Sequence, residues 1–163
     1  MNNDVQLVNF LDMPYDLRVE SFKWRTAQHV DKYFQLHNMD LDGHKKWLDT
    51  MLGDNPKTIA FFICVNGVPV GATFFQKTDW GARTTDWGIY IYDTNMRGRG
   101  IGSTVLAKSL EYARDVMGMN KVFLSVLPTN TRAIHVYENA GFCHVSTDDN
   151  GVRTYVFDIP KEK

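Results

Sequence analysis

Apolar and polar positions along this chain follow two periodicities, one typical of strands and one typical of helices. Two β-rich runs, 58–65 and 68–75, flank Asn66-Gly67, and Asn-Gly between such runs is a strong signal for a tight hairpin. The last two runs flank a similar turn at Asp149-Asn150-Gly151. Together the runs predict seven strands, over residues 5–11, 58–65, 68–75, 84–92, 121–127, 142–147 and 153–159.

Helical spacing of apolar residues and end signals predict four helices. Asp40 is a candidate N-cap for a helix over 41–52, and Gly118 ends a long helix over 101–117. Another helix is expected over 27–36 with Thr26 as its cap, and the last begins after Thr129 or Asn130 and ends at Gly141. In the helix over 41–52 the residues expected to face inward are Trp47, Leu48, Met51 and Leu52.

Composition narrows the class of protein. The 163 residues are enough for a sizeable core and are expected to form a single domain, 1–163. A net charge of −1 gives no reason to expect a nucleic-acid or anionic-membrane partner. Cys64 and Cys143 lie in apolar runs without metal-site spacing, so we expect two buried thiols, no metal and a reducing, cytoplasmic location. No window is apolar enough to span a bilayer, and the polar N-terminus is unlike a signal peptide.

The run Arg97-Gly98-Arg99-Gly100-Ile101-Gly102 joins a predicted strand to the long helix. A glycine-rich turn at a helix start exposes unpaired backbone N–H groups, and the helix dipole favours an anion there. The run is neither the P-loop, since no Lys-Ser/Thr closes it, nor the dinucleotide fingerprint, since its third glycine comes one residue early. It therefore predicts a phosphate site of another kind, with charge-assisted contacts from Arg97 and Arg99.

This run resembles the pyrophosphate loop of the GNAT superfamily of N-acetyltransferases, Gln/Arg-x-x-Gly-x-Gly/Ala, at Arg97, Gly100 and Gly102. The segment from Asn130 to Phe142 is similar to the same family's Asn-x-x-Ala-x-x-x-Tyr-x-x-x-Gly-Phe motif. The resemblance covers nearly the whole chain. It implies an α+β fold whose central mixed, mostly antiparallel sheet of about seven strands splays between strands four and five, flanked by about four helices.

The resemblance also implies acetyl coenzyme A as the acetyl donor. Its pyrophosphate would meet the backbone of residues 98–102, that is Gly98, Arg99, Gly100, Ile101 and Gly102, and its pantetheine arm would run along Ile89, Tyr90 and Ile91. Asn130 is expected to cap a helix, and a contact with the cofactor stays open. Tyr137 matches the family's general acid, and a phenol is a reasonable proton donor to a thiolate.

The general base is open between three candidates. Strand alternation places Asp86 on one face with Thr84, Gly88 and Tyr90, so Asp86 is the expected base if that face lines the acceptor cleft. The alternatives are His44 and a water molecule.

For the acceptor, the N-terminal half resembles a subgroup that acetylates a 4-amino sugar on UDP in the pseudaminic acid pathway of flagellin glycosylation. The matching segments are Lys23-Trp24-Arg25, Asp40 to His44 and Asp86-Trp87-Gly88, although Gly43 stands where an acidic residue is usual. Aromatic side chains would stack on the base or the sugar, and a cation would meet the diphosphate. The expected acceptor residues are Arg25, His44, Trp47, Trp80 and Trp87, with Lys77 and Arg83 as further cations.

Two other functions stay open. The early Trp-Arg pattern is shared with ribosomal-protein-type acetyltransferases, which act on protein N-termini. A non-catalytic acetyl coenzyme A sensor is the second alternative, against which Tyr137 and Asn130 argue. A homodimer is possible in each case.

Overall fold

The computed structural model describes residues 4–32, 34 and 39–160. Seven strands form one sheet in the order β1-β2-β3-β4-β5-β7-β6. Neighbouring strands are antiparallel except β4 and β5, which are parallel, so the expected mixed sheet is confirmed. The strands are β1 (Val5–Asn9), β2 (Ile59–Val65), β3 (Val68–Asp79), β4 (Thr84–Ile91), β5 (Lys121–Val126), β6 (Cys143–Thr147) and β7 (Arg153–Asp158).

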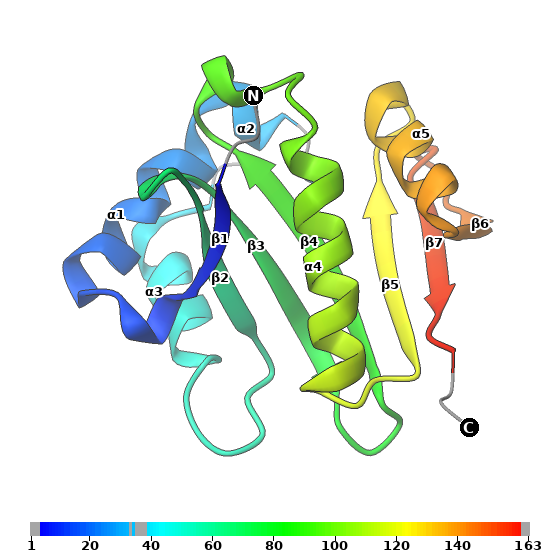
Figure 1. Cartoon of the computed structure of the whole chain (residues 1–163), viewed down its shortest axis with the longest axis horizontal. Helices are drawn as coiled ribbons and strands as arrows, with labels where there is room; N and C mark the ends of the chain where they lie inside the picture. The colour runs from blue at the N-terminus through cyan, green and yellow to red at the C-terminus, as the bar shows by residue number, and fades with distance from the viewer. Residues whose placement is uncertain (1–3, 33, 35–38, 161–163) are drawn as a thin grey trace.

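Helices cover both faces of this sheet (Figure 1). One face carries α1 (Tyr15–Thr26), α2 (Gln28–Asp31) and α3 (Leu41–Asp49), and the other carries α4 (Ile101–Asp115) and α5 (Thr131–Ala140). Two short 3₁₀ turns, Phe10–Asp12 and Thr94–Met96, follow β1 and β4. The central strands therefore lie between two layers of helices.

Strand alternation divides the core in two. Phe61 and Ile63 of β2 pack in the cluster with α4, whereas Phe62 and Cys64 belong to the cluster under α1, α2 and α3. Successive side chains of a strand point to opposite faces, so a strand covered on both faces is apolar at nearly every position. Residues Ala60 to Val65 of β2 are accordingly all buried.

The first helical region differs from the expectation. Thr26 ends α1 instead of capping a helix, and its hydroxyl donates to the Phe22 carbonyl at 2.7 Å. The inward residues of α1 include the buried polar pair Ser21 and Arg25, so the helix lacks the apolar stripe that would have revealed it. Among the described residues of the helix expected over 27–36, residues 28–31 form a helix, α2. Residues 33, 35 and 36 of that range lie outside the described residues.

Two burial expectations are also wrong. Helix α3 ends at Asp49, so Leu52 lies beyond it and is 59% exposed, although Leu48 and Met51 are buried as expected. Cys143 is exposed because it lies on β6, the outermost strand of the sheet. Cys64 is buried, and burial raises the pKa of its thiol.

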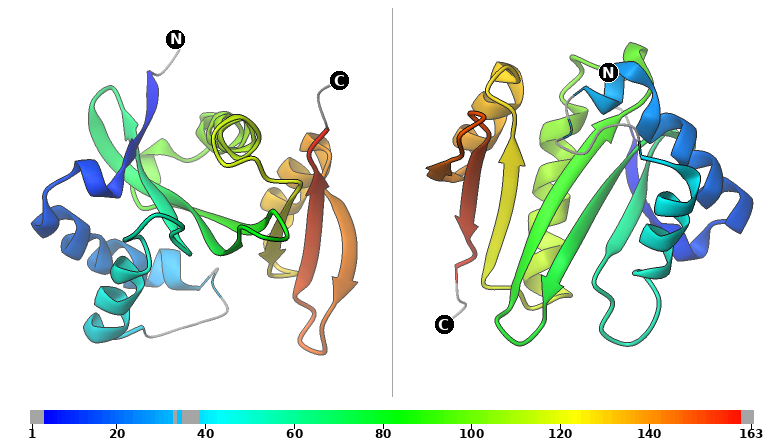
Figure 2. Two further views of the ribbon diagram at one scale, coloured as in Figure 1. Left: turned by 90° about the horizontal axis from the view of Figure 1, so that it is seen from below. Right: turned by 180° about the vertical axis from the view of Figure 1, so that it is seen from behind.

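The parallel pair β4–β5 is joined only at one end. Thr84, Thr85 and Asp86 pair with Lys121, Val122 and Phe123, and the strands then diverge, as the rear view in Figure 2 shows. The N-termini of α4 and α5 both lie at the open end (Figure 1). The predicted splay is thus present, and the sequence motifs meet beside it.

Candidate functional site

The loop before α4 is shaped by its glycines. Gly98 and Gly100 have φ of +77° and +74°, a region that glycine enters without strain, and Gly100 is the N-cap of α4. A Cβ atom placed on Gly100 or Gly102 would meet no other atom within 4 Å. The backbone of the first turn of α4 thus faces open space, where its unpaired N–H groups can receive an anion.

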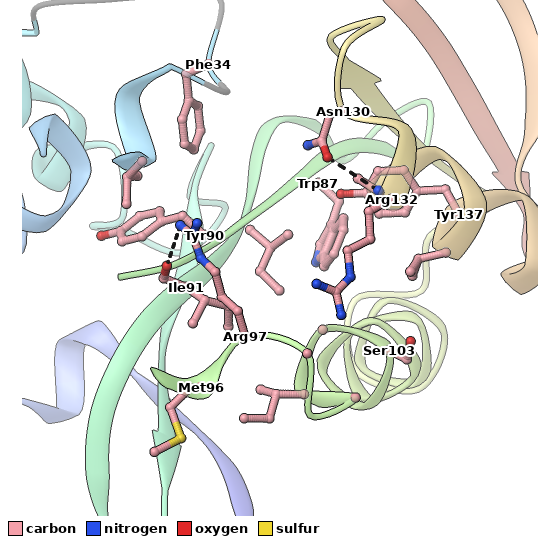
Figure 3. A pocket seen from close by; sticks show the side chains of 18 residues that line it. Phe34, Trp87, Tyr90, Ile91, Met96, Arg97, Ser103, Asn130, Arg132 and Tyr137 are labelled. Atoms are coloured by element: carbon pink, nitrogen blue, oxygen red, sulfur yellow. Dashed lines mark hydrogen bonds between the residues drawn. The ribbon is translucent and has the colours of Figure 1, made fainter. Parts of the chain in front are cut away.

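A first cavity of about 340 Å³ opens above this turn, between β4 and the start of α5 (Figure 3). Its lining brings together nearly all the residues predicted to hold the cofactor: Ile89, Tyr90, Ile91, Arg97, Gly98, Gly100, Ile101, Gly102, Asn130 and Tyr137. Arg99 is the exception, since it is exposed and does not line the cavity. The lining suits coenzyme A: open helix amides for phosphates at one end, and the unpaired edge of β4 along the side.

Two arginines flank the glycine loop. The Arg97 guanidinium donates to the carbonyls of Ile91 at 3.2 Å and His29 at 3.3 Å, so it also ties the loop to the end of β4. Arg132, on the first turn of α5, was not predicted as a site residue. Its guanidinium lies 3.3 Å from where a Cβ on Gly98 would stand, and its side chain extends into the cavity (Figure 3). A cation two residues after the motif's Asn130 is the signal that would have identified it.

Asn130 and Tyr137 belong to α5. Asn130 Oδ1 accepts from the Ala133 amide at 3.4 Å, which confirms the expected N-cap. The Tyr137 ring packs edge-on against Trp87, with ring centroids 6.0 Å apart. Burial raises the pKa of Tyr137 to about 12, so its hydroxyl holds its proton throughout the neutral range.

A second cavity, of about 420 Å³, lies on the α1–α3 face of β4. It shares part of its lining with the first cavity, including Trp87, Asn130 and Tyr137. The two cavities therefore meet at Tyr137, and the second is the natural place for an acceptor. The predicted residues that line it are Arg25, His44, Trp47, Asp86 and Trp87, together with Lys77.

Asp86 is the last residue of β4 that pairs with β5, so its carboxyl lies where the splay begins. Burial raises the pKa of Asp86, and the positive charge of Lys77 partly offsets that shift. The carboxyl faces the second cavity on the same side of the sheet as Gly88 and Tyr90, as strand alternation predicted.

His44 and Arg25 are engaged within the protein. His44 Nε2 lies 3.1 Å from both Ser21 Oγ and the Arg18 carbonyl. The Ser21 hydroxyl itself donates to that carbonyl at 2.6 Å, an arrangement that favours the tautomer with the proton on Nε2. Burial lowers the pKa of His44. Arg25 forms an ion pair with Asp31 at 2.9 Å and lies over the Phe34 ring, 3.7 Å from its centroid.

The tryptophans divide between the cavity and the core. Trp47 Nε1 donates to Gln76 Oε1 at 3.3 Å in the second cavity. Trp87 is 4% exposed, and its Nε1 is the one buried side-chain nitrogen or oxygen among the described residues that lacks a hydrogen-bond partner. Since the Trp87 ring lines both cavities, this N–H is an unused donor beside their junction.

Two residues expected to contact the acceptor, Trp80 and Arg83, lie away from the second cavity. Trp80 lies in the β3–β4 turn, packs with the α4 cluster and donates to the Pro56 carbonyl at 3.0 Å. Arg83 lies in the same turn and does not line the second cavity. The turn is at the closed end of the splay, because both residues precede the β4 residues that pair with β5.

Other residues of the second cavity went unpredicted. They are Phe34, Met39, Phe74, Gln76, Ser125, Val126 and Leu127. Phe74 and Gln76 could have been found from alternation along β3, since they share a face of the sheet and pair with Gly88 and Asp86 of β4. Within the described part of the chain, no helix is long and apolar enough to cross a membrane, and no three His, Cys, Asp or Glu side chains gather as a metal site would require.

Curated relatives match parts of the chain. Spermidine N(1)-acetyltransferase of Vibrio cholerae is 33% identical over 73 residues, which are 45% of this chain and 42% of that protein. Mycothiol acetyltransferase of Salinispora tropica is 38% identical over 78 residues, or 48% of this chain and 25% of that protein. The matches thus span less than half the length of these two relatives.

Solved structures match nearly the whole chain. A domain from Methanocaldococcus jannaschii has a TM-score of 0.79 at 18% identity, covering 96% of this chain and 99% of that one. Campylobacter jejuni N-acetyltransferase PseH in complex with acetyl coenzyme A has a TM-score of 0.71 at 18% identity, covering 95% and 99%. Spermidine N-acetyltransferase from Vibrio cholerae in complex with CoA and spermine has a TM-score of 0.79 at 19% identity, covering 95% of each chain. At such identities these likenesses show a common fold.

The family assignment has its own support in the sequence. The Acetyltransferase (GNAT) family matches residues 14–142, which include the glycine loop, the Asn130 helix and the strands between which the sheet splays. The chain belongs to the acetyltransferase (GNAT) family.

Proposed function

We propose that this chain transfers the acetyl group of acetyl coenzyme A to a primary amine on a small acceptor. The observation that carries the proposal is the meeting of two cavities at Tyr137. One is lined by the exposed amides of α4, which suit phosphates, and the other by the Asp86 carboxyl, which suits an amine.

Acetyl coenzyme A supplies a thioester, whose acetyl carbon an uncharged amine can attack. The glycine loop and Arg132 would hold its phosphates, and the free edge of β4 beyond Asp86 would orient its arm. Tyr137 holds a proton at Oη and would donate it to the departing thiolate. The presence of Tyr137 and Asn130 argues against a non-catalytic acetyl coenzyme A sensor.

Asp86 is the proposed base, acting directly or through a water molecule. An ammonium must lose a proton before it attacks, and a carboxylate with a raised pKa is a better acceptor for that proton than an ordinary one. His44 is a poorer choice, because burial lowers its pKa and its Nε2 lies within hydrogen-bond distance of Ser21 Oγ and the Arg18 carbonyl.

For the acceptor we propose a UDP-linked 4-amino-4,6-dideoxy sugar. Three aromatic rings, Phe34, Trp47 and Phe74, border the second cavity and offer faces for a sugar or a base. Lys77 supplies a cation, while Arg83 lies elsewhere and Arg25 is paired with Asp31. The motifs at 23–25, 40–44 and 86–88 and the fold shared with PseH also support this choice.

A polyamine is the main competing small acceptor, because spermidine acetyltransferases share the fold. Several positive charges call for several carboxylates, yet Asp86 is the only acidic side chain among the described residues that line the second cavity, and Lys77 would repel a second ammonium. A protein N-terminus would need an open groove with backbone partners. The cavity thus favours an acceptor with one amine.

Purified protein with acetyl coenzyme A should be offered three acceptors: a UDP-linked 4-amino-4,6-dideoxy sugar, spermidine and an N-terminal peptide, with products read by mass spectrometry. We expect acetylation of the sugar nucleotide, and a large loss of that activity in Tyr137→Phe. Acetylation of none of the three would contradict the proposed reaction, whereas efficient acetylation of the peptide or spermidine alone would contradict the proposed acceptor.

A further inference from the structure

Strand β3 carries an extra residue where it passes the second cavity. Gln76 pairs with Asp86 and Asp79 pairs with Thr84, so Lys77 and Thr78 together stand opposite Thr85. This is a β-bulge, a feature that re-aims side chains and is frequent beside active sites. Thr78 is buried and its hydroxyl lies 2.9 Å from that of Thr85, so it occupies the regular position on the α4 face.

Lys77 is therefore the inserted residue, and its backbone has a φ of +51°. A long side chain at positive φ is strained, and glycine or asparagine is the usual occupant of such a position. A strained residue that persists where a better-suited one would serve the fold is a reason to look for a function. The strained backbone places Lys77 in the lining of the second cavity, where its positive charge acts on the Asp86 carboxyl.

The surroundings of Lys77 do not explain it by packing. The residue is exposed, and within the described part of the chain its ammonium forms no hydrogen bond or ion pair. Its neighbours in the cavity lining are Gln76 and Asp86. Gln76 Oε1 accepts from Trp47 Nε1, which leaves the Gln76 amide nitrogen as a second donor.

We propose that Lys77 is a specificity-determining residue whose ammonium binds an anionic group, phosphate or carboxylate, that the acceptor carries beside its amine. The inference rests on the proposed acetyl transfer and deepens it. Asp86 receives the proton of the acceptor's amine. Lys77, which the bulge places in the cavity lining, binds the acceptor's anionic group, and the Gln76 amide donates a further hydrogen bond to it. A cavity with one carboxylate and one ammonium selects an acceptor with one amine and one anion.

The test uses acceptors in matched pairs. The first pair is the UDP-linked 4-amino-4,6-dideoxy sugar and the same amino sugar without UDP; the second is phenylalanine and phenylalaninamide. The variants are Lys77→Asn and Lys77→Gly, which remove the charge and tolerate positive φ, and Lys77→Arg, which keeps the charge. Thermal unfolding of each variant checks that the fold survives.

We expect the wild type to prefer the charged member of one pair at least tenfold in kcat/KM. Lys77→Asn and Lys77→Gly should raise KM for that member about tenfold or more, with KM for its neutral counterpart and for acetyl coenzyme A unchanged, and Lys77→Arg should restore much of the loss. A response of the first pair to the Lys77 variants would identify the anion as a diphosphate, and a response of the second pair would identify it as a carboxylate. Equal treatment of both members by the wild type, or unchanged KM in Lys77→Asn, would overturn the inference.

Calorimetry with the acetyl-coenzyme-A-loaded protein separates this inference from the proposed reaction. If no acceptor is acetylated, the proposed reaction has failed, and binding of UDP or phenylalanine still decides the role of Lys77. Binding that is lost in Lys77→Asn and kept in Lys77→Arg would support it. Equal binding to wild type and Lys77→Asn, or no binding of either probe, would overturn it.

Discussion

The Tyr137 hydroxyl keeps its proton at neutral pH because burial raises its pKa to about 12. Tyr137→Phe retains the ring that packs against Trp87 and removes only the donor. We expect the rate of acetyl transfer to fall by roughly 10²–10⁴, the usual contribution of a general acid. Steady-state kinetics measures the fall, and calorimetry should show unchanged acetyl coenzyme A affinity. Wild-type turnover, or a variant that unfolds, would remove the acid role.

Asp86 gives the reaction a dependence on pH. Its pKa is raised by burial, so activity should fall as the pH drops through a value above the ordinary range of an aspartate. Since Lys77 lowers the pKa of Asp86, Lys77→Asn should move this acidic limb to higher pH. The pH–rate profiles of the two proteins make the comparison. Coincident acidic limbs would show that Asp86 is not the titrating base.

The same raised pKa makes a prediction about stability. Folding disfavours the ionised form of Asp86, so the stability present at low pH is lost as pH rises through the folded-state pKa. Asp86→Asn removes this charge and should raise the melting temperature near pH 7 while depressing the rate. Thermal unfolding at pH 7 and at pH 4 measures the effect, which should be smaller at pH 4. A lower melting temperature at pH 7 would contradict it.

At the scale of residues, sequence reasoning brought side chains to the cavities where a motif fixed their spacing, and not where residue type alone was used. The motif places Tyr137 seven residues after Asn130 on one helix, and the structure has that helix as α5 with Asn130 as its N-cap. Trp80 and Arg83 were chosen because an aromatic ring and a cation suit a nucleotide, but the position of a turn relative to a cavity depends on strand pairing. The place of Lys77 in the cavity lining depends on a bulge, which no hydrophobic pattern shows.

Among the structural elements, the β3–β4 pair offers a test of how the acceptor cavity is shaped. A Cβ atom on Gly88 would lie 2.5 Å from the Phe74 ring, so the absence of a side chain leaves room for that ring. Gly88→Ala should push Phe74 into the second cavity, raise the acceptor KM and destabilise the fold by ~1–3 kcal/mol. Combining it with Phe74→Leu should recover part of both losses. Independent, additive effects of the two changes would show that they do not act on each other.

A substitution in the first turn of α4 should have opposite effects on the stability of the protein and on its binding of acetyl coenzyme A. Gly102 lies within the helix, and a Cβ there meets no atom within 4 Å, so Gly102→Ala should stabilise the free protein by up to ~1 kcal/mol. The added methyl group enters the first cavity and should weaken acetyl coenzyme A binding. Unfolding and calorimetry measure the two effects, with Gly118→Ala, outside that cavity, as a control for binding. Unchanged affinity in Gly102→Ala would remove the loop from the cofactor site.

The elements predicted best are those with a regular apolar pattern. The β2–β3 hairpin and α4 have continuous or periodic apolar positions, and their bounds differ from the expectation by a few residues. Helix α1 was missed because its buried residues are the polar Ser21, which contacts His44, and Arg25, which pairs with Asp31. A helix whose buried side is polar cannot be recognised by hydrophobic spacing.

At the scale of the whole molecule, the order of elements carried most of the information. An antiparallel sheet with one parallel pair needs a crossover, and the long α4 between β4 and β5 supplies it. That topology places the glycine loop and the start of α5 at the same open end of the splay (Figure 1). The depth of the second cavity could not be read from order alone, because side chains of α1, α3 and β3 that are distant in sequence define it.

The short ladder between β4 and β5 has a consequence for the dynamics of the free protein. Beyond Asp86 and Phe123 the two strands form no hydrogen bonds with each other. Some of the backbone N–H and C=O groups along this seam, the facing edges of β4 and β5, therefore depend on solvent as their hydrogen-bond partner in the free protein. Hydrogen exchange should therefore be faster for residues 87–91 than for the interior of β2, which is paired on both sides. A ligand that spans the seam would slow that exchange and, at 100 times its Kd, add about 2.7 kcal/mol to the unfolding free energy. The amides of β4 would then report occupancy of the cavity in the absence of any acceptor.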